Sequence, residues 1–434
     1  MTGLRGLDPV TGGLQILLDD VAPLAHGALA DYIPELARAD PEQFGIALVS
    51  MDGHVYSVGD AAVPFTIQSV SKPFVYALAL ADLGAEEVMD RVGAEPSGEA
   101  FNAIRLDPVT GRPPNPMVNA GALLTTSLVQ ASDPVEQFER IRACLSAFAG
   151  RELAVDETLY ASELGSASRN RALAYLMESA GSLRADVEHT IDVYCRQCSV
   201  AVTACDLGVM AATLANGGVN PVTGAVVVGE SVAVRALSVM ATCGMYDFSG
   251  EWLLRVGLPA KSGVPGGLIA ASPAEFGIGV FSPLLDERGN TVRGVAVARE
   301  LSERFDLHLM HHPGRTAPVV YLATTATTGD GRDVAILAAQ GDLEFAAAER
   351  LLWMIDEALS GGTAAPAILL LDLHRVTRVH RIAERMLDTR LADAAGRGVA
   401  VALVRQQHLD VTLDAGTPFD SREEALAWCG LVST

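Results

Sequence analysis

The order of strand-like and helix-like stretches in the larger, N-terminal part of the chain most restricts how it can fold. Residues 45–58 alternate apolar and polar side chains around Asp52-Gly53, which is typical of a β-hairpin. Residues 268–285 are again strand-like, and the alanine- and leucine-rich stretch from about residue 73 to 240 favours helices. Strands from both ends must therefore pair in one sheet that carries a helical insertion.

Residues 292–310 favour a helix that closes this first domain, and a proline- and glycine-containing segment at 312–318 is typical of a linker. Beyond it strands and helices alternate, which predicts a small α/β sandwich. The expected strands cover 319–325, 334–339, 367–373 and 399–404, and the expected helices cover 345–359, 379–395 and 422–429. We therefore expect two α/β domains, residues 1–312 and 318–434.

The charge balance limits the classes of partner. The formal net charge is -22, whereas nucleic acids and anionic membranes require a basic surface. Half of the 434 residues are hydrophobic, yet no apolar run reaches membrane-spanning length. The first residues lack the pattern of a secretory signal. We expect a cytoplasmic protein that binds neither nucleic acid nor membranes.

Two groups of residues raise the possibility of a metal site. Cys195 and Cys198 form a C-x-x-C motif, but no second Cys or His pair lies nearby in the sequence, so buried free thiols are favoured over a zinc or redox role. His308, His311 and His312 lie at a helix end in a carboxylate-poor stretch, which favours a solvated cap. We therefore expect neither a metal nor a cofactor.

The chain is almost free of lysine. Of its 31 basic residues, 29 are arginine, and the two lysines are Lys72 and Lys261. A desolvated lysine can lose its proton and act as a base, whereas arginine stays charged. Codon bias alone is a simpler explanation of the count, but both lysines fall within motifs that carry chemistry.

Lys72 belongs to an S-x-x-K motif that begins at Ser69 and is followed by the apolar stretch 74–83. A spacing of three places both side chains on one face of a helical first turn, where burial would lower the lysine pKa. The positive end of the helix would stabilise a developing oxyanion. The alternative is that Ser69 caps the helix, with Thr66 and Ser71 also of capping type, and that Lys72 is a surface residue.

Lys261 begins a K-S-G motif, Lys261-Ser262-Gly263, which precedes a glycine-rich strand at 266–270. Such a strand edge can present a free backbone N–H to a nucleophile, although an ordinary turn is the alternative. S-x-x-K and K-[ST]-G, in this order, are elements of serine acyl-transfer enzymes of the β-lactamase and penicillin-binding group.

Residues from about 20 to 310 closely resemble the serine-dependent glutaminases, which have the β-lactamase/DD-peptidase-like fold. The resemblance rests on stretches in fixed order: FTIQSVSKPF (65–74), NPMVNAGAL (115–123), SELGSASRNRALAYLM (162–177), YCRQCSV (194–200), VTACDLGVMAATLANGGVNPVTG (202–224), MYDFSGEW (245–252) and GLPAKSGVPGG (257–267). Cys195 and Cys205 depart from the residue types expected there, but neither is a contact position.

The resemblance implies hydrolysis of L-glutamine to L-glutamate and ammonia, with Ser69 as nucleophile and Lys72 as base. It places the oxyanion on the backbone amides of Ser69 and Val264, and a tyrosine hydroxyl, Tyr246 or Tyr194, as an acid beside Lys72. The implied glutamine contacts are Ser69, Asn119, Glu163, Asn170, Tyr194, Tyr246 and Val264. Glu163 suits the α-ammonium, and the amides and hydroxyls suit the α-carboxylate.

Glu163 and Asn170 are seven residues apart, so one continuous helix over 162–177 would present both on one face. Lys261 is expected to have a supporting electrostatic role. The family usually forms homo-oligomers, which implies a dimer or tetramer.

Residues 318–432 resemble a STAS domain, through the AILLLDL strand (367–373) and the helix that follows. Where that family often has a phosphorylatable serine, this chain has His380, Arg381, Ile382 and Ala383. This departure makes a phosphorylation switch doubtful and leaves a protein-binding, self-association or passive structural role.

Three other functions compete with the glutaminase reading. A β-lactamase or penicillin-binding enzyme would share both motifs, but no clear S-D-N lies between them. A non-catalytic regulator would use the second domain and leave the lysine motifs dispensable. A cysteine-dependent amidotransferase is disfavoured because no cysteine lies in a nucleophile-elbow pattern.

Overall fold

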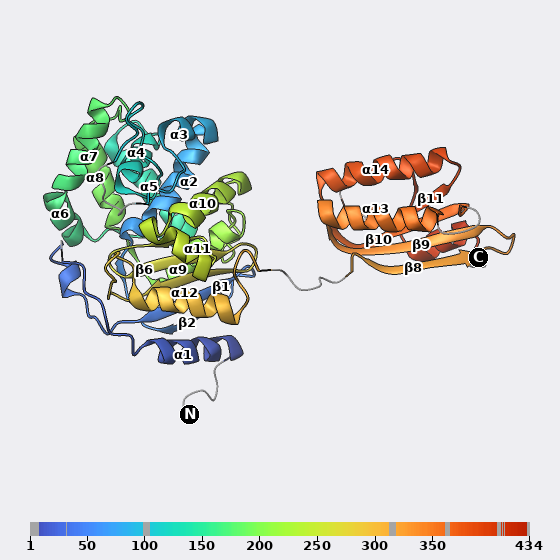
Figure 1. Ribbon diagram of the computed structural model, residues 1–434, viewed down its shortest axis with the longest axis horizontal. Helices are drawn as coiled ribbons and strands as arrows, with labels where there is room; N and C mark the ends of the chain where they lie inside the picture. The colour runs from blue at the N-terminus through green and yellow to red at the C-terminus, as the bar shows by residue number, and fades with distance from the viewer. Residues whose placement is uncertain are drawn as a thin grey trace. The chain divides into compact units, whose positions relative to one another are not determined.

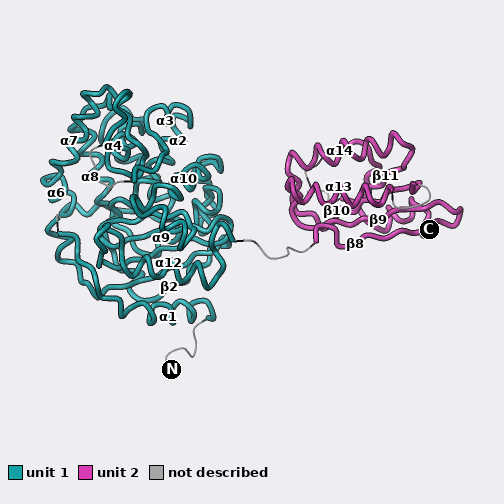
Figure 2. The backbone as a smooth tube through the Cα atoms, in the orientation of Figure 1, with its two compact units in different colours: residues 1–311 teal, residues 312–434 magenta. Residues whose placement is uncertain are grey.

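The computed structural model describes residues 8–31, 33–98, 105–311, 318–360, 365–405, 409, 411 and 413–431. The chain divides into two compact units, residues 1–311 and 312–434 (Figure 2). Of the expected linker, residues 312–317, and with them His312, lie outside the described residues.

The first unit contains a five-stranded antiparallel sheet whose strands come from both ends of the unit, as the sequence predicts (Figure 1). The strand order is β2-β1-β7-β6-β5, with β1 (Gly45–Ser50), β2 (Val55–Gly59), β5 (Ala260–Ser262), β6 (Gly267–Ser272) and β7 (Phe276–Phe281). The predicted hairpin is β1–β2, in which Val49 is paired with Val55. The sheet thus joins segments more than 200 residues apart, because β1 pairs with β7.

Helices cover both faces of this sheet. The helices α1 (Pro9–Val21) and α12 (Val292–Arg304) lie on one face, where Ile46 and Leu48 of β1 join their core, and α9 (Ala204–Ala215) covers the other face. A Cβ at Gly277 of β7 would lie 2.1 Å from the backbone nitrogen of Ala212 in α9. Glycine in β7 therefore lets α9 pack backbone to backbone against the sheet.

A helical insertion lies between β2 and β5 in the sequence. Its helices are α2 (Lys72–Leu83), α3 (Ala85–Arg91), α4 (Asn119–Leu128), α5 (Pro134–Ala149), α6 (Glu157–Ser166), α7 (Ser168–Ser179), α8 (Val187–Cys198), α9, α10 (Glu230–Cys243) and α11 (Ser249–Arg255). The short elements of the unit are η1 (Leu36–Arg38), β3 (Phe65–Thr66), η2 (Gln68–Ser71), β4 (Ala201–Val202) and η3 (Tyr246–Phe248).

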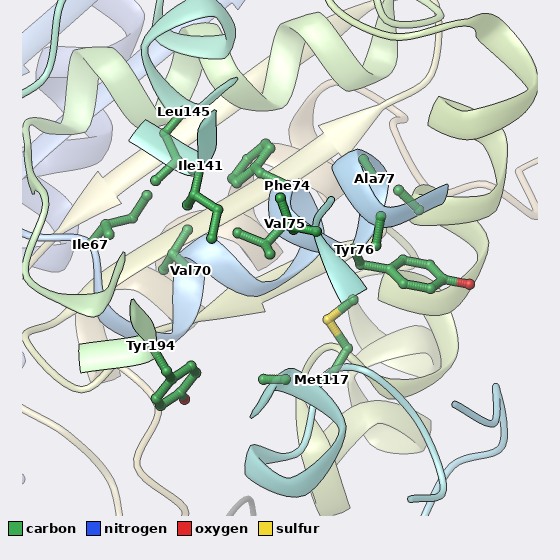
Figure 3. Close-up of a cluster of buried hydrophobic side chains, with 14 of the residues drawn as sticks. Ile67, Val70, Phe74, Val75, Tyr76, Ala77, Met117, Ile141, Leu145 and Tyr194 are labelled. Atoms are coloured by element: carbon green, nitrogen blue, oxygen red, sulfur yellow. The ribbon is translucent and has the colours of Figure 1, made fainter. Parts of the chain in front are cut away.

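The predicted apolar helix at 74–83 is α2, and it is buried in the core of the insertion. Figure 3 shows Val70 of η2 together with Phe74 of α2, Ile141 and Leu145 of α5. Phe74 and Ile141 are 0% exposed. Burial of such side chains contributes about 1.5–3 kcal/mol each, so the start of α2 is fixed by packing.

Two local expectations are wrong. Residues 162–177 do not form one helix: α6 ends at Ser166, and Ala167, with ψ of 19°, separates it from α7. Ser71 is the N-cap residue of α2 but makes no capping hydrogen bond: its backbone is already helical, and its hydroxyl oxygen accepts from the Gln197 amide at 2.9 Å instead of from the helix.

The second unit is a five-stranded mixed sheet of order β12-β11-β10-β9-β8. Its strands are β8 (Val320–Thr327), β9 (Asp333–Leu343), β10 (Ile368–Val379), β11 (Ala400–Val404) and β12 (Thr417–Phe419), and its helices are α13 (Phe345–Ser360), α14 (Arg381–Gly396) and α15 (Arg422–Cys429). The cores indicate that α13 and α14 cover one face and α15 the other.

The predicted alternation of strands and helices is present in the second unit, with three differences. The strand expected at 334–339 continues to Leu343 as β9. The strand at 367–373 continues to Val379 along β9, with an irregular register, so α14 begins at Arg381 instead of residue 379. The three-residue strand β12 was not predicted, because Thr417–Phe419 contains a proline and is too short to show a period. Within the part of the chain that the structure describes, no helix is both long and apolar enough to cross a membrane.

Candidate active site

Ser69 and Lys72 lie at the junction of the sheet and the helical insertion. Ser69 belongs to the 3-10 turn η2, and Lys72 is the first residue of α2, so the pair spans the boundary between two elements instead of sharing one helical turn. Ser69 is 9% exposed and Lys72 is 1% exposed, which excludes the surface alternative for this lysine.

Lys72 is held by neutral oxygen atoms. Its Nζ donates hydrogen bonds to Oδ1 of Asn119 at 2.7 Å and to the carbonyl of Met117 at 3.2 Å. Burial lowers its pKa from 10.5 to about 7, against smaller opposing effects of Cys198 and Glu163. Near neutral pH a large fraction of this amine is therefore unprotonated and able to accept a proton.

Lys261, on β5, approaches the same site from the sheet. Its Nζ donates to the hydroxyl of Tyr246 at 2.8 Å and lies 3.9 Å from the centroid of that ring. Burial, together with the charge of Lys72, holds the pKa of Lys261 well below its usual range. Burial also raises the pKa of Tyr246, and a hydrogen bond with the Ser69 side chain opposes that rise. Tyr246 thus connects Lys261 to Ser69.

The K-S-G motif brings Val264 close to the Ser69 turn. A Cβ at Gly263 would lie 3.0 Å from Cγ2 of Val70 and 3.2 Å from the carbonyl oxygen of Ile67. Gly263 therefore packs directly against the turn that contains Ser69. Only a residue without a side chain fits there without displacement, which explains the glycine.

A cavity of about 290 Å³ opens beside Ser69. It is lined by Gln68, Ser69, Asn119, Glu163, Ser166, Ala167, Arg169, Asn170, Tyr194 and Val264. Six of the predicted site residues are in this lining. Lys72 and Tyr246 are not, but they reach it through Asn119 and Ser69. Glu163 and Asn170 line the same cavity although the helix between them is broken.

Glu163 is the acidic residue of the cavity lining, and it is 7% exposed. Burial raises the pKa of its carboxyl group from 4.5 to about 7, and hydrogen bonds from Gln68 and Cys198 and the charge of Lys72 oppose this rise. The Gln68 amide donates to Oε2 of Glu163 at 2.6 Å. A cationic group placed in the cavity would favour the ionised carboxylate.

Four cavity residues were not predicted from the sequence: Gln68, Ser166, Ala167 and Arg169. Of these, Gln68 and Arg169 directly precede the predicted residues Ser69 and Asn170, and both are in stretches that carry the family resemblance. Arg169 is exposed and is the cation among the described lining residues. The position of Gln68 and Arg169 next to predicted site residues was the one signal available in the sequence. It is a weak signal, because the side chain of a neighbouring residue often points away from the site.

The residues first considered for a metal site have other partners. Cys195 and Cys198 are buried free thiols, and Nδ1 of His308 accepts a hydrogen bond from the backbone of Met310 at 3.1 Å. Among the described residues, no group of three or more His, Cys, Asp or Glu side chains is placed to hold a metal ion.

Comparison with known proteins identifies the family of this chain. Residues 27–310 match the glutaminase family. The chain is 60% identical over 287 residues to "Glutaminase 2" and 45% identical over 415 residues to "Glutaminase 1", both of Bradyrhizobium diazoefficiens. These alignments cover 66% and 92% of this chain but only 46% and 67% of the two relatives. The glutaminase of Corynebacterium glutamicum is 44% identical, over 91% of this chain and 94% of its own length.

Solved structures give the same result. A crystal structure of Mglu is 41% identical with a TM-score of 0.84, and the match covers 93% of this chain and 100% of that one. The "probable glutaminase ybaS" is 40% identical with a TM-score of 0.68, over 70% of this chain. These matches place the chain among the amidohydrolases. Within that class, it belongs to the glutaminase family.

Proposed function

We propose that this chain hydrolyses L-glutamine to L-glutamate and ammonia through a glutamyl ester on Ser69. The observation that carries the proposal is the cavity lined by Ser69, Val264 and Glu163, together with the buried amine of Lys72, which donates to Asn119 of the same lining. The family match supports the same reaction.

The proposed reaction begins when Oγ of Ser69 attacks the carbon of the substrate carboxamide. Neutral Lys72 accepts the hydroxyl proton, for which a pKa of about 7 is well matched. The backbone amides of Ser69 and Val264 stabilise the oxyanion. The intermediate then expels ammonia and leaves the glutamyl ester.

The leaving nitrogen must be protonated before it departs, either by Lys72 or by a tyrosine hydroxyl. Tyr246 is favoured over Tyr194, because its hydroxyl contacts both Ser69 and Lys261. Water then attacks the ester, gives a proton to the regenerated base, and releases glutamate and Ser69. The sum is one amide and one water converted to one acid and one ammonia.

The cavity residues suit free glutamine rather than a neutral amide. Ionised Glu163 pairs with the α-ammonium, while Asn119, Asn170 and the tyrosine hydroxyls bind the α-carboxylate. The guanidinium of Arg169 at the cavity supports the binding of an anionic group.

Release of ammonia and glutamate from L-glutamine, with L-asparagine as the comparison substrate, tests this function. The wild type should prefer glutamine, and Ser69→Ala should lose at least about 10³-fold in kcat, as expected when a nucleophile is removed. Circular dichroism should show that the variant is folded. Wild-type turnover by Ser69→Ala would exclude Ser69 as the nucleophile, and no turnover by the wild type would exclude the function.

We further propose that residues 318–434 form a STAS-like domain that binds a protein partner, and that the protein forms a dimer or tetramer in the cytoplasm. The order of β10 and α14 after a buried β9 supports the first proposal. Light scattering during size-exclusion chromatography tests the second, for which a monomer at micromolar concentration would be the contrary result.

A further inference from the structure

The residue before the proposed nucleophile has a strained backbone. Gln68 has φ of 46°, in the left-handed region that residues other than glycine rarely adopt. Such a conformation persists only where the surroundings enforce it, and it sets the direction of the next residue, Ser69. The side chain of Gln68 also holds Glu163, at 2.6 Å. The conformation of one residue therefore governs the positions of two others in the site.

A chain of buried hydrogen bonds leads to this residue. Ser71 donates its hydroxyl to the carbonyl of Gln68 at 2.8 Å, and the amide of Gln197 in turn donates to the Ser71 hydroxyl at 2.9 Å. Thr126 donates to the amide oxygen of Gln197 at 2.8 Å. Ser71, Gln197 and Thr126 are each 0% exposed. Because water does not reach these groups, they have no solvent partner to replace a lost one.

The chain connects the Ser69 turn to two helices of the insertion. Thr126 belongs to α4, and Gln197 belongs to the last turn of α8, which also carries Tyr194 of the cavity. Just beyond α8, the carbonyl of Val200 accepts a hydrogen bond from the backbone N–H of Ile67 at 2.8 Å. The end of α8 and the residue just beyond it therefore hold the turn at two points: Ile67 before Gln68 and Ser71 after it.

We propose that Gln197 is a positioning residue that acts through Ser71 to keep Gln68 in its left-handed conformation, and thereby aligns Ser69 and Glu163. This inference rests on the proposed glutaminase function. It assigns a role to the Gln197 side chain, which touches neither the nucleophile nor the cavity. The competing explanation is that Gln197 only contributes a buried hydrogen bond to folding.

Steady-state kinetics of three variants separate the two explanations. Gln197→Met keeps the shape but removes both hydrogen bonds, and Ser71→Ala breaks the chain one step closer to Gln68. We expect each to lower kcat/KM for glutamine by at least about tenfold. Thr125→Val is the matched control, since Thr125 is a buried neighbour on α4 whose hydroxyl donates only to Gly121. It should lose thermal stability to a similar degree while keeping wild-type kcat/KM.

The double variant Ser71→Ala/Gln197→Met tests whether the two residues act in one chain. If they do, its kcat/KM should be close to that of the less active single variant. Independent roles would instead multiply the two losses in kcat/KM. Gln197→Glu provides a conservative rescue, because burial favours a protonated carboxyl that can replace the amide in both hydrogen bonds. At a pH of about 6 it should keep more of the wild-type kcat/KM than Gln197→Met does.

Wild-type kcat/KM in Gln197→Met, multiplying losses in the double variant, or an equal loss in Thr125→Val would each overturn the proposal. If Gln197→Met fails to fold, Ser71→Ala and Gln197→Glu decide: wild-type kcat/KM in Ser71→Ala, or a kcat/KM of Gln197→Glu that does not recover as pH falls relative to wild type, would overturn the proposal. Because all values are taken relative to wild-type hydrolysis of glutamine, an inactive wild type would refute the proposed function instead.

Discussion

The amine of Lys261 and the hydroxyl of Tyr246 are 2.8 Å apart, and both groups are buried. Tyr246 has φ of 58°, so its backbone, like that of Gln68, lies in the left-handed region. The ring is thereby directed between Lys261 and Ser69. This explains why the second lysine belongs to the site although it does not line the cavity.

We expect Tyr246→Phe to lower kcat by at least about 10²-fold, the usual contribution of a positioned acid or base, with KM within a few-fold of wild type. The change keeps the ring but removes the hydroxyl that meets Ser69 and Lys261. Tyr76→Phe is the control, because Tyr76 is a buried tyrosine of α2 (Figure 3) that is not among the residues lining the cavity. Steady-state ammonia release measures both, and an unchanged kcat in Tyr246→Phe would eliminate its hydroxyl from the reaction.

The activity should rise with pH through about 7. Lys72 must be neutral to accept a proton, and its pKa of about 7 means that protonation removes the base at lower pH. Glu163, with a pKa of about 7, must be ionised to bind the substrate ammonium, so its titration acts in the same direction. The two groups interact, so the kcat/KM profile reports them as a pair. A profile that falls as pH rises from 6 to 8 would be incompatible with a lysine base.

Lys72→Met should abolish turnover yet unfold at a higher temperature near neutral pH. The lysine pKa is 10.5 ordinarily and about 7 when folded, so the unfolded chain binds more protons between these values. The wild type consequently gains stability as pH rises from about 7 to 10.5, and below that window the cost of burying the amine is fully present. The variant lacks this cost, and its Tm should rise less steeply with pH. A lower Tm than wild type at pH 7 would show that the hydrogen bonds of Lys72 stabilise the fold by more than the burial of its amine costs.

Asn119→Asp should shift the pH dependence while keeping the size of the side chain, although the hydrogen bond that Asn119 donates to Asn170 is lost. Oδ1 of Asn119 accepts a hydrogen bond from Lys72 at 2.7 Å, so a carboxylate there would stabilise the charged amine. An opposite charge at this distance raises a lysine pKa by about 1–3 units, which moves the rise in kcat/KM to higher pH by a similar amount. Asn170→Asp is the control, because Asn170 accepts a hydrogen bond from Asn119 but does not contact Lys72 in the described structure. An identical shift in both variants would contradict a direct effect on Lys72.

The sequence predicted those features that follow from periodicity and motif order. The β1–β2 hairpin follows from alternation around Asp52-Gly53, and the single sheet follows from strands at both ends of the insertion. The motif residues Ser69 and Lys261 belong to one site, in which Tyr246 connects them, because both lie where the insertion joins the sheet. In the second unit, runs such as 367–373 are apolar enough to be recognised as buried strands.

Backbone conformation inside the site could not be predicted in the same way. The residues around Gln68 do not indicate a left-handed backbone, because the hydrogen bond from Ser71 to the Gln68 carbonyl is itself held by Gln197, which is distant in the sequence. The break at Ala167 was equally hidden, since alanine is a strong helix former and the flanking period suits one continuous helix.

The final prediction concerns the approach of the K-S-G segment to the Ser69 turn. Gly263→Ala would put a methyl group 3.0 Å from Val70 and 3.2 Å from the Ile67 carbonyl, and we expect the segment to shift by a few tenths of an ångström to relieve these contacts. That shift draws the Val264 amide from its proposed position at the oxyanion. Loss of one such donor lowers kcat by about 10²–10³-fold, and overpacking costs about 1–3 kcal/mol of stability.

Gly250→Ala supplies the comparison for this change, because a Cβ at Gly250 of α11 meets nothing within 4 Å. It should retain wild-type kcat and unfold at the same or a slightly higher temperature, since alanine is favoured over glycine in a helix by about 1 kcal/mol. Kinetics and thermal unfolding of both variants in one buffer complete the test. A Gly263→Ala enzyme that loses stability but keeps its kcat would show that the packing of Gly263 against the Ser69 turn matters for folding alone. It would also show that groups other than the Val264 amide stabilise the oxyanion.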